Sequence, residues 1–274
     1  MTFSLVACDL EARQWGVTVA SKFPAVGAVV PWARGDVGAV ATQSYANVSY
    51  GPEGLGMLAT GLSAQQTLER LTAADAEREQ RQLGVVDAKG DSATFSGSAC
   101  MDWAGGRTGP CFAAQGNILA GPEVVDVLVE TFLATTGFLA ERMLAALLAA
   151  DRAGGDRRGR QGAAVIVRQT GAGYGGNNDI LIDLRVDDHQ DPVPELIRIH
   201  SVHDLLFGHT PPERFLPLEG DLGAEVQGLV SSLGHDSLAA WAGVENLEER
   251  LDPAGTSIDP EVLKALRAAA AGPR

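Results

Sequence analysis

The first 43 residues contain four short runs of strand-forming residues that carry almost no charge. They are residues 3–9, 14–21, 25–30 and 37–43, and the polar tip Glu11-Ala12-Arg13 predicts a hairpin between the first two. Ala, Val and Gly occupy both alternating faces of these runs, so the strands are expected to be buried on both sides. Such a sheet needs other elements to cover it, and we expect helices to follow.

The next 145 or so residues supply those helices and further strands. Ser63 and Gln66 have the spacing of a capping box, which predicts a helix over 64–82 that ends at Gly84. Other predicted helices are 55–61, 122–134 and 138–153, and other predicted strands are 84–87, 92–95, 112–115, 163–169 and 180–186. Because most strands come as adjacent hairpins, we expect an α+β fold in which two antiparallel sheets stack face to face with helices outside.

The composition changes after Gly208, where three prolines mark a linker. We therefore predict a main domain over residues 1–208 and a small domain over 209–274. The second carries 11 acidic and 5 basic residues, and its pattern predicts helices from about 224, over 237–242 and over 259–271. A domain of this size is expected to need the main domain or a partner for stability.

The composition excludes several classes of partner. The net charge of -14 argues against nucleic acid and against an anionic membrane surface. Three cysteines in a chain of 274 residues give no disulfide framework and fit a reducing compartment. We see no signal peptide and no apolar run of about 18 residues, so we expect a soluble cytoplasmic protein.

Two further patterns could indicate a cofactor or metal site. The glycine-rich stretch 171–176 lacks the Lys-Ser/Thr of a phosphate-binding loop, and we interpret it as a mobile turn or lid. Asp187-Asp188-His189 would place neighbouring side chains on opposite faces of a strand. We therefore expect no metal and no cofactor.

Thr2 is the residue with the clearest chemical potential. If Met1 is removed, Thr2 carries both a nucleophilic hydroxyl and a free α-amine that can act as its base. An α-amine has an ordinary pKa of about 7.7–8.0, so much of it can be neutral near pH 7. The plainer interpretation is a chain that simply begins with a strand.

Five motifs in order resemble a bacterial family of unknown function that is placed in the N-terminal nucleophile (Ntn) hydrolase superfamily. They are 2–7 (TFSLVA), 19–27 (VASKFPAVG), 41–43 (ATQ), 115–117 (QGN) and 155–161 (GDRRGRQ). The resemblance covers residues 1–208 and implies a four-layer αββα sandwich and amide-bond hydrolysis, without naming a substrate. Lys22 stands where an Arg is expected, which keeps the charge but loses any bidentate contact.

The same resemblance implies a site around Thr2. Ser21 and Lys22 end the second strand, and an ammonium near Thr2 would stabilise developing negative charge. Asn117 could donate its amide to an oxyanion. The alternatives are a solvated strand end for Ser21 and Lys22 and a turn for Asn117.

The densest charge cluster contains Asp156, Arg157, Arg158 and Arg160. One of these arginines could hold a substrate carboxylate bidentately, which would make the substrate a small acidic amide. The alternative is a salt-bridged turn with Asp183, Asp187 or Asp188 as partners.

The tail resembles a peptidoglycan-binding module in Leu218–Gln227 and Leu233-Gly234. A glycan fragment is one expected ligand, and a structural or dimer-forming role is the alternative.

The leading prediction for the whole chain is an amide-bond hydrolase that acts through Thr2. The alternative is a catalytically silent Ntn-fold binding or scaffold protein. We also expect a homodimer, because the strands and the helical region 122–150 leave much apolar surface.

Overall fold

The structure is a computed structural model that describes residues 2–208 and 210–272. It divides into two compact units, Met1–Ile197 and Arg198–Arg274, and the division falls inside helix α5 (Pro192–Phe207). Each unit is described by itself.

The first unit contains a six-stranded sheet in which all neighbouring strands are antiparallel. Its order is β10 (Ile180–Val186), β9 (Gly162–Arg168), β2 (Gln14–Ser21), β1 (Thr2–Asp9), β8 (Phe112–Asn117) and β7 (Gly105–Gly109). Every residue of β2 and β8 is buried, as expected for strands that are apolar on both faces.

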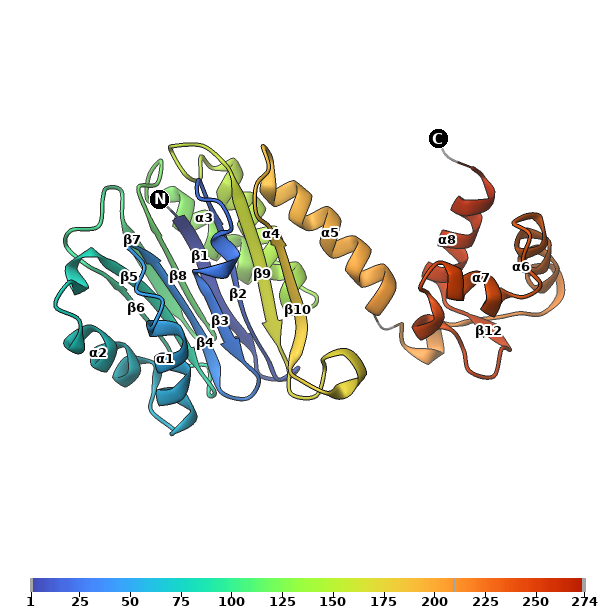
Figure 1. Ribbon diagram of the computed structural model, residues 1–274, viewed down its shortest axis with the longest axis horizontal. Coiled ribbons are helices and arrows are strands. Elements are labelled where there is room, and N and C mark those ends of the chain that lie inside the picture. The colour runs from blue at the N-terminus through green and yellow to red at the C-terminus, as the bar shows by residue number, and fades with distance from the viewer. Residues whose placement is uncertain (1, 209, 273–274) are drawn as a thin grey trace. The chain divides into compact units, whose positions relative to one another are not determined.

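A second, four-stranded antiparallel sheet lies against the first (Figure 1). Its order is β3 (Pro31–Arg34), β4 (Gly38–Ser44), β5 (Arg81–Asp87) and β6 (Ser92–Ser96). A buried apolar cluster fills the space between the sheets, with side chains that include Val6, Val17, Val19, Ala39, Ala41, Val86, Ala113 and Ile166. The even-numbered side chains of β1 therefore face the second sheet.

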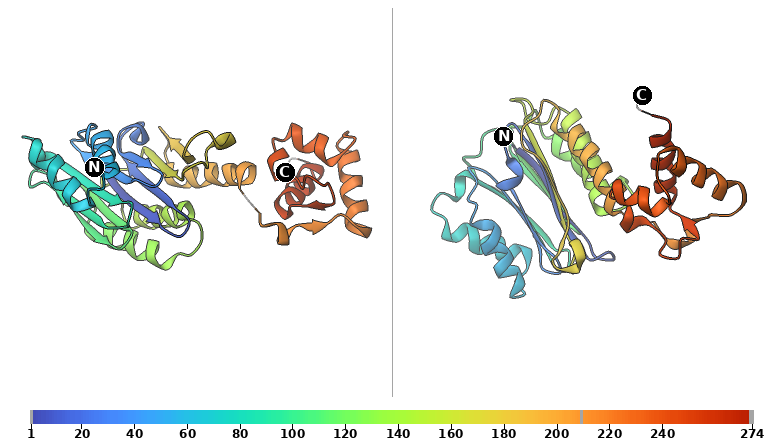
Figure 2. Two further views of the ribbon diagram at one scale, coloured as in Figure 1. Left: turned by 90° about the horizontal axis from the view of Figure 1, so that it is seen from below. Right: turned by 45° about the vertical axis from the view of Figure 1, so that its right-hand side comes forward.

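Helices cover the outer face of each sheet (Figures 1 and 2). Helices α1 (Tyr50–Ala59) and α2 (Ala64–Ala74) pack on the four-stranded sheet. Helices α3 (Glu123–Ala134) and α4 (Leu139–Arg152) pack on the six-stranded sheet. Much of the apolar surface of region 122–150 is thus covered by the same chain, and only a few large side chains there, such as Leu133 and Phe138, stay exposed.

The prediction of a mixed fold with antiparallel sheets and a helical C-terminal region is confirmed. The capping box at Ser63 is also confirmed. The predicted strand over 25–30 is wrong, because Val26–Ala28 forms a 3-10 turn and the strand starts at Pro31 instead. Proline is tolerated there as the first residue of an edge strand.

One helix end and two whole elements also differ from prediction. Helix α2 ends at Ala74 rather than near residue 82, because Asp75 leaves the helical conformation and binds Arg81. Strand β7 was not predicted, since three of its five residues are glycine. Helix α5 was not predicted either. Its two prolines, Pro192 and Pro194, lie in its first turn, where proline is compatible with a helix.

The second unit is a small helical body. It contains α6 (Gly220–Ser232), α7 (Leu238–Val244), α8 (Pro260–Ala270) and the two-residue strands β11 (Leu216–Pro217) and β12 (Ser257–Ile258). Trp241 lies buried among apolar side chains, and a buried Arg250–Asp259 ion pair of 2.6 Å ties the last helix to the preceding loop. Within the described residues of both units, no helix is long and apolar enough to cross a membrane.

Candidate active site around Thr2

Thr2 is held at the end of β1 between two neighbouring strands. The antiparallel registers place Ser21 of β2 and Asn117 of β8 directly opposite Thr2, one on each side. The Oγ1 atom of Thr2 lies 3.1 Å from the Oγ atom of Ser21. Thr2 is only 7% exposed, and its place in the strand turns its side chain toward the space between the sheets.

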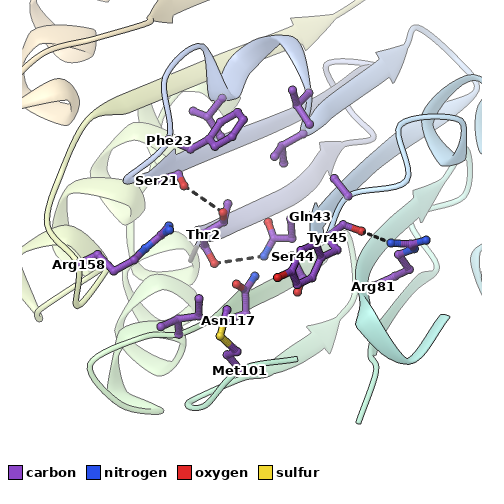
Figure 3. Close-up of a pocket in the computed structure, with 15 residues that line it drawn as sticks. Thr2, Ser21, Phe23, Gln43, Ser44, Tyr45, Arg81, Met101, Asn117 and Arg158 are labelled. Atoms are coloured by element: carbon purple, nitrogen blue, oxygen red, sulfur yellow. Dashed lines mark hydrogen bonds between the residues drawn. The ribbon is translucent and has the colours of Figure 1, made fainter. Parts of the chain in front are cut away.

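A cavity of about 480 Å³ opens over these three residues (Figure 3). Its other lining residues come from the segment after β2, the end of β4, the start of β5, the loops around β7 and β8, and the connection between α4 and β9. They are Phe23, Val26, Val29, Val30, Gln43, Ser44, Tyr45, Ala46, Arg81, Met101, Ile118 and Arg158. This lining contains two arginines and no acid, although the chain has 35 acids against 21 bases. The cavity therefore offers a local positive site in a strongly acidic protein.

The backbone is unusual beside the cavity. Ser44 and Ile118 both line it with positive φ angles of 70° and 52°, and Ala25 has a φ of 51° in the segment between two lining residues. A β-branched residue such as Ile rarely adopts this conformation. Outliers of this kind persist only where the surroundings hold them, and they cluster at functional sites.

The buried side chain of Gln82 fixes the orientation of Asn117. Its Nε2 donates to the carbonyl of Gly116 at 2.7 Å, and because a carbonyl can only accept, Oε1 of Gln82 must point the other way. That oxygen accepts from Asn117 Nδ2 at 2.9 Å and from Gln43 Nε2 at 2.8 Å. Asn117 therefore presents an amino group, whose second N–H can donate to an oxygen in the cavity.

The hydrogen-bond network continues from Gln43 to the backbone of Thr2. Gln43 Oε1 accepts from Ser4 Oγ at 2.7 Å, and Ser4 Oγ accepts from Gln115 Nε2 at 2.6 Å. Gln43 Nε2 also reaches the carbonyl oxygen of Thr2 at 3.3 Å (Figure 3). Gly84 makes room for this network, since a Cβ at its position would collide with Oε1 of Gln115.

Arg158 is the member of the predicted arginine cluster that reaches the cavity. Its side chain extends toward Thr2 and Ser21 in Figure 3. The buried carboxylate of Asp156 lies behind it, 3.3 Å from Nη2, and also accepts the backbone N–H groups of Arg158 and Lys22 at 2.9 and 2.7 Å. Asp156 thus supports Arg158 rather than lining the cavity itself.

The other predicted residues lie elsewhere. Arg160 binds Asp151 at 2.8 Å and Asp191 at 3.3 Å, so the predicted ion-pair partners Asp183, Asp187 and Asp188 are wrong for it. Lys22 donates from Nζ to the carbonyl of Arg160 at 3.2 Å and lines a separate polar depression with that arginine. Arg157 is exposed and is not among the residues that line either cavity.

The second arginine of the lining, Arg81, is held by acids outside the cavity. It binds Asp75 at 2.9 Å and Glu77 at 2.6 Å, and it donates to the carbonyl of Tyr45 at 2.8 Å. The hydrogen bond from Arg81, together with those from Glu77 N and Tyr50 Oη, holds the pKa of Asp75 well below its usual range. Arg81 is therefore held by two acids, whereas Arg158 has one acid behind it and extends toward Thr2 (Figure 3).

The glycine-rich turn 171–176 is remote from the cavity. Strand β9 pairs Gly162 with Ser21 near Thr2, and Arg168 with Trp15 at the far end, where the turn follows. A lid role over Thr2 is thus ruled out in this arrangement. Among residues 2–208 and 210–272, no group of three His, Cys, Asp or Glu side chains could hold a metal ion.

Sequence reasoning did not identify the glutamine network or the apolar wall of the cavity. The sequence does contain a pattern that indicates the network. Gln43, Gln82 and Gln115 interrupt strands that are otherwise apolar, and buried amides of this kind need hydrogen-bond partners. The apolar side chains of the cavity come from separate loops. Which loops lie next to each other depends on the strand registers, which the sequence pattern does not give.

Comparison with known proteins follows the division of the chain. Residues 2–196 match the model of a family described as "Family of unknown function (DUF1028)", and residues 206–266 match one described as "Putative peptidoglycan binding domain". A similar solved structure is the crystal structure of protein SPO2555 from Silicibacter pomeroyi, which is assigned to the DUF1028 family model. It is 28% identical, covers 81% of this chain and 88% of its own, and has a TM-score of 0.68. No curated protein matches the chain.

Proposed function

We propose that this chain, which belongs to the family of unknown function DUF1028, is an amide-bond hydrolase with Thr2 as its nucleophile. The observation that carries the proposal is the position of Thr2, whose hydroxyl lies at the cavity floor between Ser21 and Asn117. The mechanism requires cleavage of the Met1–Thr2 bond, because a preceding peptide bond would remove the basic amine.

In this mechanism the α-amine of Thr2 takes the proton from Oγ1, which attacks the carbonyl carbon of the substrate. The developing oxyanion accepts the second N–H of Asn117. Collapse of the tetrahedral intermediate breaks the C–N bond, and the ammonium returns its proton to the leaving amine. Water, activated by the same amine, then hydrolyses the ester on Oγ1.

Two stacked antiparallel sheets with helices on both outer faces support assignment to the αββα sandwich of the Ntn hydrolases. Here Thr2 begins β1, which has β2 and β8 as neighbours.

Arg158 suits an acidic substrate. Its planar guanidinium can bind both oxygens of a carboxylate, and no acidic residue is among those that line the cavity. We therefore propose a small acidic amide as the substrate.

The test is a screen of amides with full-length protein whose N-terminal Thr2 has been verified by intact mass. Thr2→Ser keeps a hydroxyl and an amine and should retain part of the activity. Thr2→Ala should lose at least about 10³-fold in kcat/KM, because the nucleophile is gone. If Thr2→Ala matches the unmodified protein on every amide that is cleaved, the proposed mechanism is wrong.

A second function has support in the C-terminal unit. Its match to a peptidoglycan-binding family fits a glycan ligand, and it has a cavity of about 450 Å³ lined partly by Gln227, Ser237 and Ser257. Binding of soluble peptidoglycan fragments by the full chain would support this role. If the first unit does not hydrolyse amides, the alternative that we propose is a catalytically silent Ntn-fold scaffold. We also propose that the protein is cytoplasmic.

A further inference from the structure

We propose that the cavity binds an amide whose two halves differ in chemistry. One half carries a carboxylate that Arg158 holds, and the other carries an aryl or branched aliphatic group that packs on Tyr45, Met101 and their neighbours. That this ligand is the substrate rests on the proposed hydrolysis at Thr2. Binding of the ligand can be measured without turnover.

The apolar half is inferred from side chains exposed at the cavity. Phe23, Tyr45 and Met101 all line it and are 48%, 60% and 53% exposed. Large apolar side chains that gather at one place on a surface typically mark a binding site. The lining also includes the buried side chains of Val26, Val30 and Ile118, which add to its apolar surface.

The carboxylate half is inferred from charge. Arg158 and Arg81 are the two charged residues in the described lining, and Arg81 is already bound by Asp75 and Glu77. Arg158 has a buried acid behind it, which fixes the guanidinium while its side chain stays 44% exposed. A fixed, partly exposed guanidinium is a better carboxylate site than a mobile one, because less conformational freedom is lost on binding.

The arrangement of these residues sets the order of groups in the ligand. In Figure 3, Arg158 approaches Thr2 from one side, and Tyr45 lies on the other side beyond Gln43. An amide carbonyl placed at Oγ1 of Thr2 therefore separates the carboxylate from the apolar group. The volume of about 480 Å³ lies within the range of small-molecule sites and suits a ligand of this length.

Calorimetric titration of the full-length Thr2→Ala protein tests the inference, because that variant cannot turn its ligands over. The probes are phenylacetylglycine and N-benzylsuccinamic acid, which place the apolar group on the acyl side and on the amine side. Phenylacetylglycinamide lacks the carboxylate, and acetylglycine lacks the ring. We expect at least one of the first two to bind tenfold or more tightly than both truncated probes. Equal binding of all four, or no binding, overturns the proposal.

Variants with matched controls test which residues bind the carboxylate and which bind the apolar group. Arg158→Gln should abolish the preference for phenylacetylglycine over its amide, whereas Arg157→Gln, a neighbouring exposed arginine outside the cavity, should not. Tyr45→Ala should reduce the preference for the ring, and Tyr174→Ala, which is 80% exposed and remote, is its control. Equal effects of each variant and its control would overturn the assignment. Separate hydrolysis assays on protein with an intact Thr2 decide the proposed function, so the two can fail independently.

Discussion

At the scale of single residues, the proposed chemistry depends on how few conformations Thr2 and Asn117 can adopt. Ser21 and Asn117 are fixed opposite Thr2 by strand register, and Gln82 fixes which end of the Asn117 amide faces the cavity. None of these contacts needs a charged side chain. The site is therefore organised by neutral hydrogen bonds between buried groups, which become strong where water is excluded.

Gln82→Met is the sharpest test of this organisation. Removing the amide leaves Asn117 free to turn its oxygen toward the substrate, so kcat should fall by about 10², with little change in KM. Steady-state kinetics on a cleaved amide measures both values. Gln14→Met is the matched control, since Gln14 is also a buried strand glutamine but lies in the six-stranded sheet and binds Gln169 far from the cavity. A similar fall of kcat in both variants would indicate a general loss of packing instead.

At the scale of elements, the cavity depends on where helix α2 ends and strand β5 begins. Asp75 follows the last residue of α2 and accepts hydrogen bonds from Tyr50 Oη at 2.8 Å and from Arg81 Nε at 2.9 Å. Arg81 is the first residue of β5 and lines the cavity. The carboxylate thus joins two helices and a strand at the edge of the site.

Asp75→Asn should lower the free energy of unfolding by about 2 kcal/mol at pH 7, because charge-assisted hydrogen bonds are lost. The hydrogen bond from Arg81 lowers the pKa of Asp75 in the folded state, so its stabilisation is complete above the unfolded pKa of about 3.9. It is lost progressively as pH falls from that value toward the lower folded-state pKa, so the difference between variant and parent should be smaller at pH 3 than at pH 7. Urea unfolding at pH 7 and pH 3 measures this. Asp91→Asn, at an exposed residue, is the control, and a difference independent of pH would contradict the account.

Much of this element pattern could be predicted from local sequence. The capping box at Ser63 and the strand over 180–186 depend on neighbouring residues alone. The site could be predicted only in part. The motifs around Thr2, Ser21 and Asn117 pointed to residues that the structure brings together, whereas Lys22 and Arg160 lie in another depression. Which arginine of 157–160 turns inward depends on Asp156 and on the turn geometry, which a charge pattern does not contain.

At the scale of the whole molecule, a homodimer stays a prediction. The apolar faces of α3 and α4 are mostly covered by the sheet of the same chain, so the strongest remaining feature is the exposed pair Leu133 and Phe138. Sedimentation equilibrium should give twice the chain mass, and the double variant Leu133→Glu/Phe138→Glu should give the monomer. Tyr174→Glu is the control. A monomer at every concentration of the unmodified chain would refute the dimer.

The proposed mechanism requires that Thr2 carries a free amine in the working protein. Mass spectrometry of the protein isolated from its own cells, with N-terminal fragment ions, measures it directly. We predict a chain whose first residue is Thr2. A chain in which any residue still precedes Thr2 would contradict the account, because the amine would then be an amide and could not take the proton of Oγ1.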